Sequence, residues 1–196
     1  MADTPAASND ALAERLVQIL GRENVLRDER DRTFYSRDLS WREMEVADVV
    51  IRPGSVEQLS SAVRVATENG HAVVPRGGGM SYTGGYTPKR AASVLLDMQR
   101  MDNIIEVNVD DMYVIVETGC TWKKLYETLA PLGVRTPYWG PLSGAYATVG
   151  GALSQNSLFH GSGMWGTVAD SVIGLKVVLA DGSVVTTGSW AHKHSK

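Results

Sequence analysis

The sequence predicts an α+β fold built from two parts that pair their strands differently. In the first part, a strand, a helix and a second strand follow one another within residues 47–75. So short a connection favours a parallel pair joined by a right-handed crossover. In the second part, short strands alternate with turn-rich connections, and Asp181-Gly182 is typical of a hairpin turn. A hydrophobic content of 43% and a charged content of 21% fit a globular chain.

The start of the chain is predicted to form a leader, one helix and a polar connection. Residues 1–8 are small and polar, as in a disordered leader. A helix is expected to start at Asn9 or Asp10 and to end at Gly21. The apolar face of this helix consists of Leu12, Leu16, Ile19 and Leu20. Residues 22–42 are dense in charge without a clear period, so no helix or strand is predicted there.

The strand–helix–strand unit has clear boundaries. Ala47–Arg52 is a short apolar strand, and Ser55 with Gln58 forms a capping box for the helix that follows. Gly70 ends this helix, and Ala72–Pro75 is a second buried strand. The buried face of the helix consists of Leu59, Ala62, Val63 and Ala66.

The pattern changes near residue 90, where the second part is expected to begin. The strands predicted there are Ser93–Asp97, Ile104–Asn108, Met112–Thr118, Val172–Leu179 and Val184–Thr187. Thr121 is the expected cap of a helix that ends at Pro131 and Gly133. A short helix is expected to start near Val149.

The second strand of the first part leads directly into a glycine-rich loop. Pro75–Gly85 contains five glycines in eleven residues, and glycine lets the backbone approach a ligand closely. A run of N–H groups in such a loop forms a concave nest for an anion, to which Arg76 can add a charge-assisted hydrogen bond and Ser81 and Thr83 can add hydroxyl groups. The alternative is a flexible turn, but three successive glycines carry a large entropy cost for a turn alone. Anion binding is therefore the preferred interpretation.

The loop does not itself identify the anion. It lacks the Gly-Lys-Ser/Thr ending of a Walker A loop. A G-x-G-x-x-G spacing does occur at Gly161, Gly163 and Gly166, but no predicted strand enters it and no apolar-periodic helix leaves it. A Rossmann interpretation is therefore rejected.

A second glycine cluster, Thr148–Ser154, is followed by Gln155 and Asn156. Two glycines at a helix start can direct N–H groups at a bulky ligand. They can equally mark a point where the helix packs closely against its neighbours. The residues alone leave both interpretations open.

Several classes of function are disfavoured. A net charge of −3 gives no broad attraction for nucleic acid, and no apolar run is long enough to span a membrane. Residues 1–10 lack the features of a signal peptide, and Cys120 is a lone cysteine interpreted as a core residue. His192 and His194 are interpreted as parts of a polar tail, so no metal site is predicted. A reducing, cytoplasmic location is expected.

Taken in order, these segments resemble the FAD-binding domain of the vanillyl-alcohol oxidase / PCMH flavoprotein family, and most of all its branch of glycolate oxidase and D-lactate dehydrogenase proteins. The resemblance covers roughly residues 12–190. The matching stretches are Val49–Ser55, Val73–Gly79, Gly84-Gly85, Ala147–Gly151, Gly166–Asp170 and Val172–Gly182.

The resemblance implies two α/β lobes, one with a small parallel sheet and one mainly antiparallel, with FAD between them. It assigns the first loop to the pyrophosphate, the second cluster to the ribityl chain and isoalloxazine ring, and the segment from Gly166 to Ile173 to the adenine end. The implied FAD-binding residues are Arg76, Gly77, Gly78, Gly79, Met80, Ser81, Gly84, Gly85, Thr148, Gly150, Gly151, Ser154, Asn156, Gly166, Val172 and Ile173.

One residue in the first loop bears on how the cofactor is held. Some members of the family bond FAD covalently through a histidine in this loop, and Met80 occupies that position here. Methionine cannot form that bond, so non-covalent FAD is expected.

The resemblance also implies a domain organisation and a function. Residues 1–45 form the N-terminal leader and helix, 46–190 the FAD-binding domain, and 191–196 a tail. The substrate domain that follows in this family is expected to be absent, so a further domain or second subunit is an expected partner. No catalytic residue is assigned within the chain. The expected reaction is hydride transfer to FAD from a small alcohol, a 2-hydroxy acid. Three alternatives stay open: a module that binds FAD without turnover, a reductase of the enolpyruvyl-UDP-sugar type, and a nucleotide-binding regulatory domain.

Overall fold

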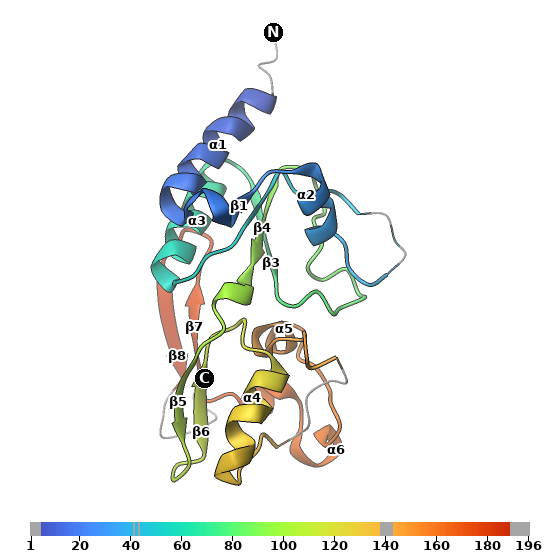
Figure 1. Cartoon of the computed structure of the whole chain (residues 1–196), viewed down its shortest axis with the longest axis vertical. Coiled ribbons are helices and arrows are strands. Elements are labelled where there is room, and N and C mark those ends of the chain that lie inside the picture. The colour runs from blue at the N-terminus through green and yellow to red at the C-terminus, as the bar shows by residue number, and fades with distance from the viewer. Residues whose placement is uncertain (1–4, 41, 43, 138–142, 189–196) are drawn as a thin grey trace. The chain divides into compact units, whose positions relative to one another are not determined.

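The computed structural model describes residues 5–40, 42, 44–137 and 143–188. The chain forms two compact units (Figure 1). Among the described residues, the first runs from residue 5 to Arg100 and includes Val178–Val185, and the second runs from Met101 to Val177 and includes residues 186–188. The expected tail at 191–196, with His192 and His194, lies outside the described residues.

A four-stranded sheet forms the centre of the first unit. Its order is β1 (Val25–Leu26), β2 (Val49–Ile51), β4 (Ser93–Asp97) and β3 (Ala72–Arg76). Strands β2, β4 and β3 are parallel, and β1 is antiparallel to β2. The expected direct pairing of the strands now labelled β2 and β3 is wrong, because β4 lies between them. Strands β2 and β4 both have partners on their two edges, and every residue of each is buried.

The helices of the first unit only partly follow the prediction. Helix α1 (Pro5–Leu20) starts before the cap expected at Asn9 or Asp10, and Gly21 follows it with φ of 84°. The segment in which no element was predicted contains a short 3₁₀ helix, strand β1 and helix α2 (Glu29–Tyr35), which Asp28 caps by accepting the Arg30 N–H. Helix α1 packs against α3, and Figure 1 shows both on one side of the strands with α2 on the other.

Helix α3 (Val56–Glu68) follows the prediction closely. The hydroxyl oxygen of Ser55 accepts the N–H of Gln58 at 3.2 Å. The side chain of Gln58 accepts the N–H of Gly54 at 2.9 Å, one residue earlier than in an ideal capping box. Gly70 closes the C-terminus with φ of 74°. Of the predicted face, Ala62, Val63 and Ala66 are buried, whereas Leu59 is half-buried.

The second unit contains the antiparallel pair β5 (Ile104–Asn108) and β6 (Tyr113–Val116). Helix α4 (Trp122–Leu129) begins after its predicted cap, Thr121, whose hydroxyl oxygen accepts the Lys124 N–H. Short helices follow it, among them α5 (Val149–Ser154), α6 (Ser162–Trp165) and a 3₁₀ helix at Val168–Ser171. A core in this unit consists of Cys120, Trp122, Leu125, Leu129, Ala152 and Val168.

Cys120 is fully buried in this core. Burial raises the pKa of its thiol to about 11, so the thiol stays protonated at neutral pH and is a poor nucleophile. The interpretation of Cys120 as a core residue is therefore confirmed.

The predicted hairpin is present as β7 (Gly174–Val178) and β8 (Val184–Gly188). Its turn contacts α3, because the hydroxyl groups of Ser60 and Thr67 donate to the carbonyl oxygens of Gly182 and Ala180. The turn therefore belongs to the first unit. The boundary between the units falls after β4, at Arg100–Met101, and not before it near residue 90.

Candidate cofactor site

The glycine-rich loop leaves the sheet of the first unit at its carboxyl edge. Because β2, β4 and β3 are parallel, their C-terminal ends meet at one edge, which is where open α/β sheets bind ligands. Strand β3 ends at Arg76, and residues 77–85 follow directly. The topology alone therefore places this loop where a ligand is expected.

The backbone N–H groups of residues 77–82 have no acceptor among the described residues. The next two are engaged: the N–H of Thr83 donates to the Ser81 hydroxyl at 3.3 Å, and the N–H of Gly84 donates to a carboxylate. Gly79 turns the chain with φ of 71°, a backbone conformation that residues with a side chain rarely adopt. A row of unpaired N–H groups is the requirement for an anion nest, since backbone donors are normally paired.

The side chain of Arg76 lies against this loop, in an aromatic cage. Arg76 is only 6% exposed. Its guanidinium carbon lies 5.0 Å, 5.4 Å and 5.7 Å from the ring centres of Tyr35, Tyr86 and Phe34. A Cβ atom at Gly79 would overlap the guanidinium of Arg76. The guanidinium therefore packs directly on the backbone of the loop. Its direct contact with a diphosphate stays a prediction.

Tyr86, which directly follows the loop, fixes the same turn. Its hydroxyl group donates to the carbonyl oxygen of Gly79 at 2.7 Å, and the carbonyl oxygen of Ser81 lies at 3.3 Å. Burial raises the pKa of Tyr86 to about 12, against the opposing effect of the nearby Arg76. The hydroxyl group therefore keeps its proton and can act as a donor throughout the neutral range.

Asp38 holds the far end of the loop. One carboxylate oxygen accepts the N–H of Gly84 at 2.7 Å, and the other accepts the N–H of Ser40 at 2.8 Å. The adjacent Leu39 donates its N–H to the carbonyl oxygen of Ser81 at 3.0 Å. Burial opposes ionisation of Asp38, but the hydrogen bonds from Ser40 and Gly84 outweigh it and lower the pKa of this carboxyl group. Gly84 is predicted to bind the cofactor, but its N–H donates to the Asp38 carboxylate.

Sequence reasoning missed these supporting residues. Phe34, Tyr35 and Asp38 come from a segment that has no clear period, and Asp38 lies far along the chain from Gly84. One local pattern could have indicated helix α2. Asp28 can cap a helix, and the acidic residues Glu29 and Asp31 in the turn that follows are typical of a helix start.

The second glycine cluster uses its N–H groups within the protein. The first three N–H groups of α5 donate to the Cys120 carbonyl from Val149, to the Thr118 carbonyl from Gly150, and to the Thr148 hydroxyl from Gly151. A Cβ atom at Gly150 would overlap both the hydroxyl and the carbonyl oxygen of Thr118. Of the two interpretations left open by the sequence, close packing accounts for these contacts. A contact between this cluster and FAD stays a prediction.

The polar residues predicted beside this cluster are also engaged. The Ser154 hydroxyl donates to the Gly150 carbonyl at 2.9 Å. Asn156 has φ of 46°, and its side-chain oxygen accepts the N–H of Ala169 at 3.3 Å. These contacts connect the end of α5 to the segment that follows α6.

The residues predicted for the adenine end lie between α6 and β7. Gly166 ends α6 with φ of 81°, where a Cβ atom would lie 2.5 Å from the Asp170 carboxylate. Val172 and Ile173 are half-buried and precede β7. No strand enters the G-x-G-x-x-G segment in this described part of the chain, and α6 is a single turn. The rejection of a Rossmann site is therefore confirmed.

The predicted site residues thus divide between the units. Arg76 to Gly85 lie together on one loop of the first unit, and the remaining residues lie in the second. Among the described residues, the first group presents a continuous row of unpaired N–H groups, at residues 77–82, so it carries the physical case for an anion site.

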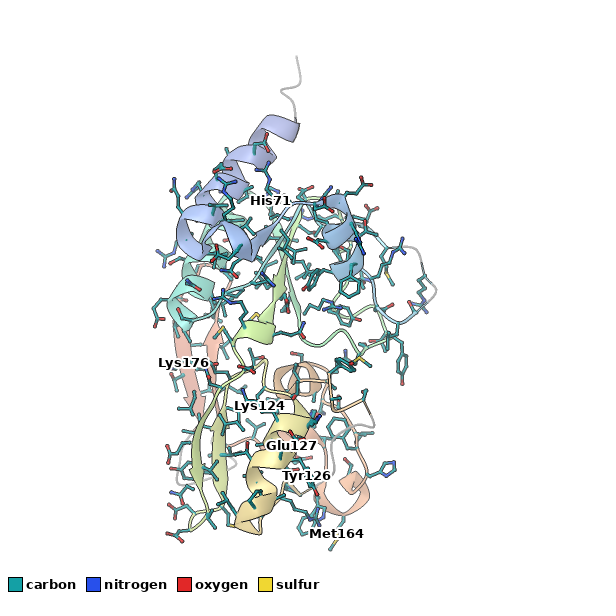
Figure 2. The ribbon with its side chains drawn as sticks, in the orientation of Figure 1. His71, Lys124, Tyr126, Glu127, Met164 and Lys176 are labelled. Atoms are coloured by element: carbon teal, nitrogen blue, oxygen red, sulfur yellow. The ribbon has the colours of Figure 1, made fainter. Side chains whose placement is uncertain are left out.

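Two polar clusters elsewhere have structural partners (Figure 2). His71 is buried, and its ring nitrogens lie 3.1 Å from the Asp48 carboxylate and 3.0 Å from the Asn69 carbonyl. It precedes β3 and so lies at the opposite end of that strand from the glycine loop. In the second unit, Lys124 donates to the Asp102 carboxylate at 2.8 Å. In the described ranges we find no group of side chains that could hold a metal ion and no helix long and apolar enough to cross a membrane.

Residues 47–188 match the model of the family described as FAD binding domain. The chain therefore belongs to this family, and FAD is its cofactor. The unpaired N–H groups of residues 77–82 fit this assignment, because the diphosphate of FAD is the kind of anion that such a nest accepts.

Two curated relatives indicate the branch of the family. The chain is 31% identical over 175 residues to the glycolate oxidase protein GlcD of Bacillus subtilis. This match covers 89% of this chain and 37% of GlcD. It is 34% identical over 173 residues to a mitochondrial D-lactate dehydrogenase (cytochrome) of Arabidopsis thaliana. This match covers 87% of this chain and 30% of the dehydrogenase. The chain thus spans about a third of the length of these relatives.

Solved structures confirm the fold. An alkyldihydroxyacetonephosphate synthase matches 94% of this chain with a TM-score of 0.82 at 23% identity. p-Cresol methylhydroxylase matches 93% with a TM-score of 0.78 at 21% identity. Each match covers little more than a third of the longer protein, at 39% and 36%. The expected PCMH-type fold, with a small parallel sheet and antiparallel pairing, is therefore confirmed.

Proposed function

We propose that this chain is the FAD-binding part of an oxidoreductase that oxidises the CH–OH group of a 2-hydroxy acid. The observation that carries the proposal is the match of residues 47–188 to the FAD binding domain. The substrate class is supported by two relatives named for glycolate and D-lactate, both of which are 2-hydroxy acids.

In this proposal, bound FAD supplies the hydride acceptor. Residues 77–82 bind the diphosphate through their N–H groups, and Asp38 and Tyr86 hold the loop in the required conformation. The groups that bind the substrate and accept its hydroxyl proton come, we propose, from the part of the longer relatives that this chain does not match. The chain's own task is to bind the cofactor and fix its orientation.

We further propose that FAD is held without a covalent bond. Met80 follows Gly79 in the loop, at the position where some members of the family carry the linking histidine. A thioether offers no comparable nucleophile. Acid precipitation of the purified protein should release all of the flavin into the supernatant. Flavin that stays with the precipitate would contradict this point.

The substrate class is tested by anaerobic reduction. D-Lactate or glycolate should bleach the absorbance of flavin bound to the chain when it is combined with the segment that completes its relatives. Bleaching by NADPH and not by either acid would favour a reductase of the enolpyruvyl-UDP-sugar type. Bound flavin that neither donor reduces would favour a binding module without turnover. The cytoplasmic location also stays a proposal, since one relative is named as mitochondrial.

A further inference from the structure

Arg76 carries a buried charge without an anionic partner among the described residues. The residue is 6% exposed, and none of the ion pairs in this part of the chain includes it. Its Nε atom has no acceptor, and Nη1 reaches only the Gly77 carbonyl at 3.4 Å. A buried charge left in this state is costly for the folded protein.

The nearest candidate counter-charge is engaged elsewhere. Asp97 lies opposite Arg76 in the register of β3 and β4 and is also buried. One oxygen of its carboxylate accepts the backbone and side-chain N–H groups of Gln99, at 3.2 Å and 3.0 Å. The guanidinium is held by the faces of three aromatic rings instead, which stabilise a cation without neutralising it.

Two of these rings come from outside the matched family domain. Phe34 and Tyr35 belong to α2, which precedes residue 47, where the match begins. The third ring, Tyr86, directly follows the loop. Helix α2 therefore builds part of the support for a loop that lies inside the matched family domain.

We propose that Arg76 is a positioning residue that supplies a buried positive charge beside the unpaired N–H groups of residues 77–82. Its guanidinium packs on the backbone at Gly79, so it supports the turn and adds a positive charge next to the loop. A doubly charged diphosphate then provides the missing anion. The inference rests on the assignment of FAD and is independent of the substrate.

The test compares three variants of the chain with the wild type. Arg76→Met removes the charge and keeps an unbranched apolar side chain, and Arg76→Lys keeps the charge without the planar group. Arg90→Met is the matched control, because Arg90 lies in the same connection between β3 and β4 but is exposed and donates only to the Gly70 carbonyl. FAD affinity is measured by flavin fluorescence at low and high NaCl, and the melting temperature is measured without FAD.

We expect Arg76→Met to weaken FAD binding about tenfold and to reduce its dependence on salt, because a buried charge acts strongly on a diphosphate. Its melting temperature without FAD should be unchanged or higher, since an unpaired charge has been removed. Arg76→Lys should recover part of the affinity and the salt dependence, and Arg90→Met should stay within about twofold of the wild type, as expected for an exposed charge.

Two results would overturn the inference. One is wild-type affinity and salt dependence in Arg76→Met. The other is a fall in melting temperature that Arg76→Lys does not reverse, which would make Arg76 a structural residue only. Failure of the wild type to bind FAD would contradict the cofactor assignment itself, so the two failures are distinguishable.

Discussion

In the first glycine loop, the N–H groups of residues 77–82 have no acceptor in the part of the chain that the structure describes, whereas at the start of α5 the first three N–H groups all donate to protein oxygens. Both segments are rich in glycine, and Gly79 and Gly150 both lie where a Cβ atom would overlap a neighbour. The difference is therefore in the hydrogen bonds and not in the composition. A loop that leaves its donors unpaired is arranged for a ligand, and one that pairs them is arranged for packing.

Hydrogen exchange gives the largest expected contrast between the two segments. Without FAD, the amides of residues 77–82 should exchange about a thousandfold faster than those of residues 149–151, because only the latter are hydrogen-bonded. Addition of FAD should slow exchange in the first segment. Mass spectrometry of overlapping peptides measures both effects. Slowing confined to residues 149–151 would reverse the assignment.

The strength of a local pattern decided which parts of the fold could be predicted. The helix capped by Ser55 and the helix capped by Thr121 were found because capping and burial repeat within a few residues. The position of β4 was missed, because this strand follows β2 and β3 in the chain and no local pattern shows that it pairs between them. Helix α2 was missed because its seven residues, ERDRTFY, bury none of their side chains.

The site shows the same limit. Five glycines after a predicted strand indicated the loop and an anion, although β3 lies at the edge of the sheet and is only partly buried, so the prediction of a buried strand was wrong. The pairing of Asp38 with Gly84 and the aromatic cage of Arg76 could not be predicted, because each joins residues that only the fold brings together. The sequence also could not separate packing from binding at the start of α5. The N–H groups of Val149 and Gly150 donate to the carbonyl oxygens of Cys120 and Thr118, which lie in the turn before α4, far earlier in the chain.

The packing role of the second cluster is tested by substitution in α5. Gly150→Ala should lower the free energy of unfolding by about 3 kcal/mol, the upper part of the range for overpacking, because its Cβ would lie 2.7 Å from the fixed backbone oxygen of Thr118. Gly163→Ala is the control: it lies in α6 with no atom within 4 Å of the added Cβ. That variant should be neutral or stabilised by up to about 1 kcal/mol. Denaturant unfolding measures both, and equal stability of the two variants would remove the packing argument.

The binding role of the first loop is tested by a substitution at Gly79. Gly79→Ala should cost about 1–2 kcal/mol of stability, because φ of 71° is strained for a side chain. It should also weaken FAD binding, since the Cβ displaces the guanidinium of Arg76. Gly70→Ala is a matched control with φ of 74° and no atom within 4 Å of its Cβ. It should lose similar stability and keep its FAD affinity. Calorimetry and flavin titration separate the two effects, and parallel losses of affinity would contradict a specific role for Gly79.

The smallest effect is expected at Asp38, which holds the far end of the first loop through a side chain. Asp38→Asn keeps one oxygen acceptor but loses the charge, so at neutral pH it should cost less than about 1 kcal/mol. The sign of the pH dependence follows from the lowered pKa of Asp38 in the folded protein. The carboxylate contributes stability above the unfolded-state pKa of about 3.9, and that contribution is lost as the pH falls through the lower folded-state value. The difference between the variant and the wild type should therefore vanish in acid.

Asp181 is the control for Asp38. It shows whether an effect on FAD affinity is specific to the glycine-rich loop or follows from the loss of any carboxylate that accepts backbone N–H groups. Its pKa is also lowered, by hydrogen bonds from the side chain and backbone of Ser183 in the hairpin turn. Asp181→Asn should show the same pH trend in stability but leave FAD affinity unchanged, whereas Asp38→Asn should weaken FAD binding as well. Equal affinity in both variants would mean that the N–H groups of residues 77–82 keep their arrangement without the contact between Asp38 and Gly84, and that Arg76 and Tyr86 are sufficient to hold the loop.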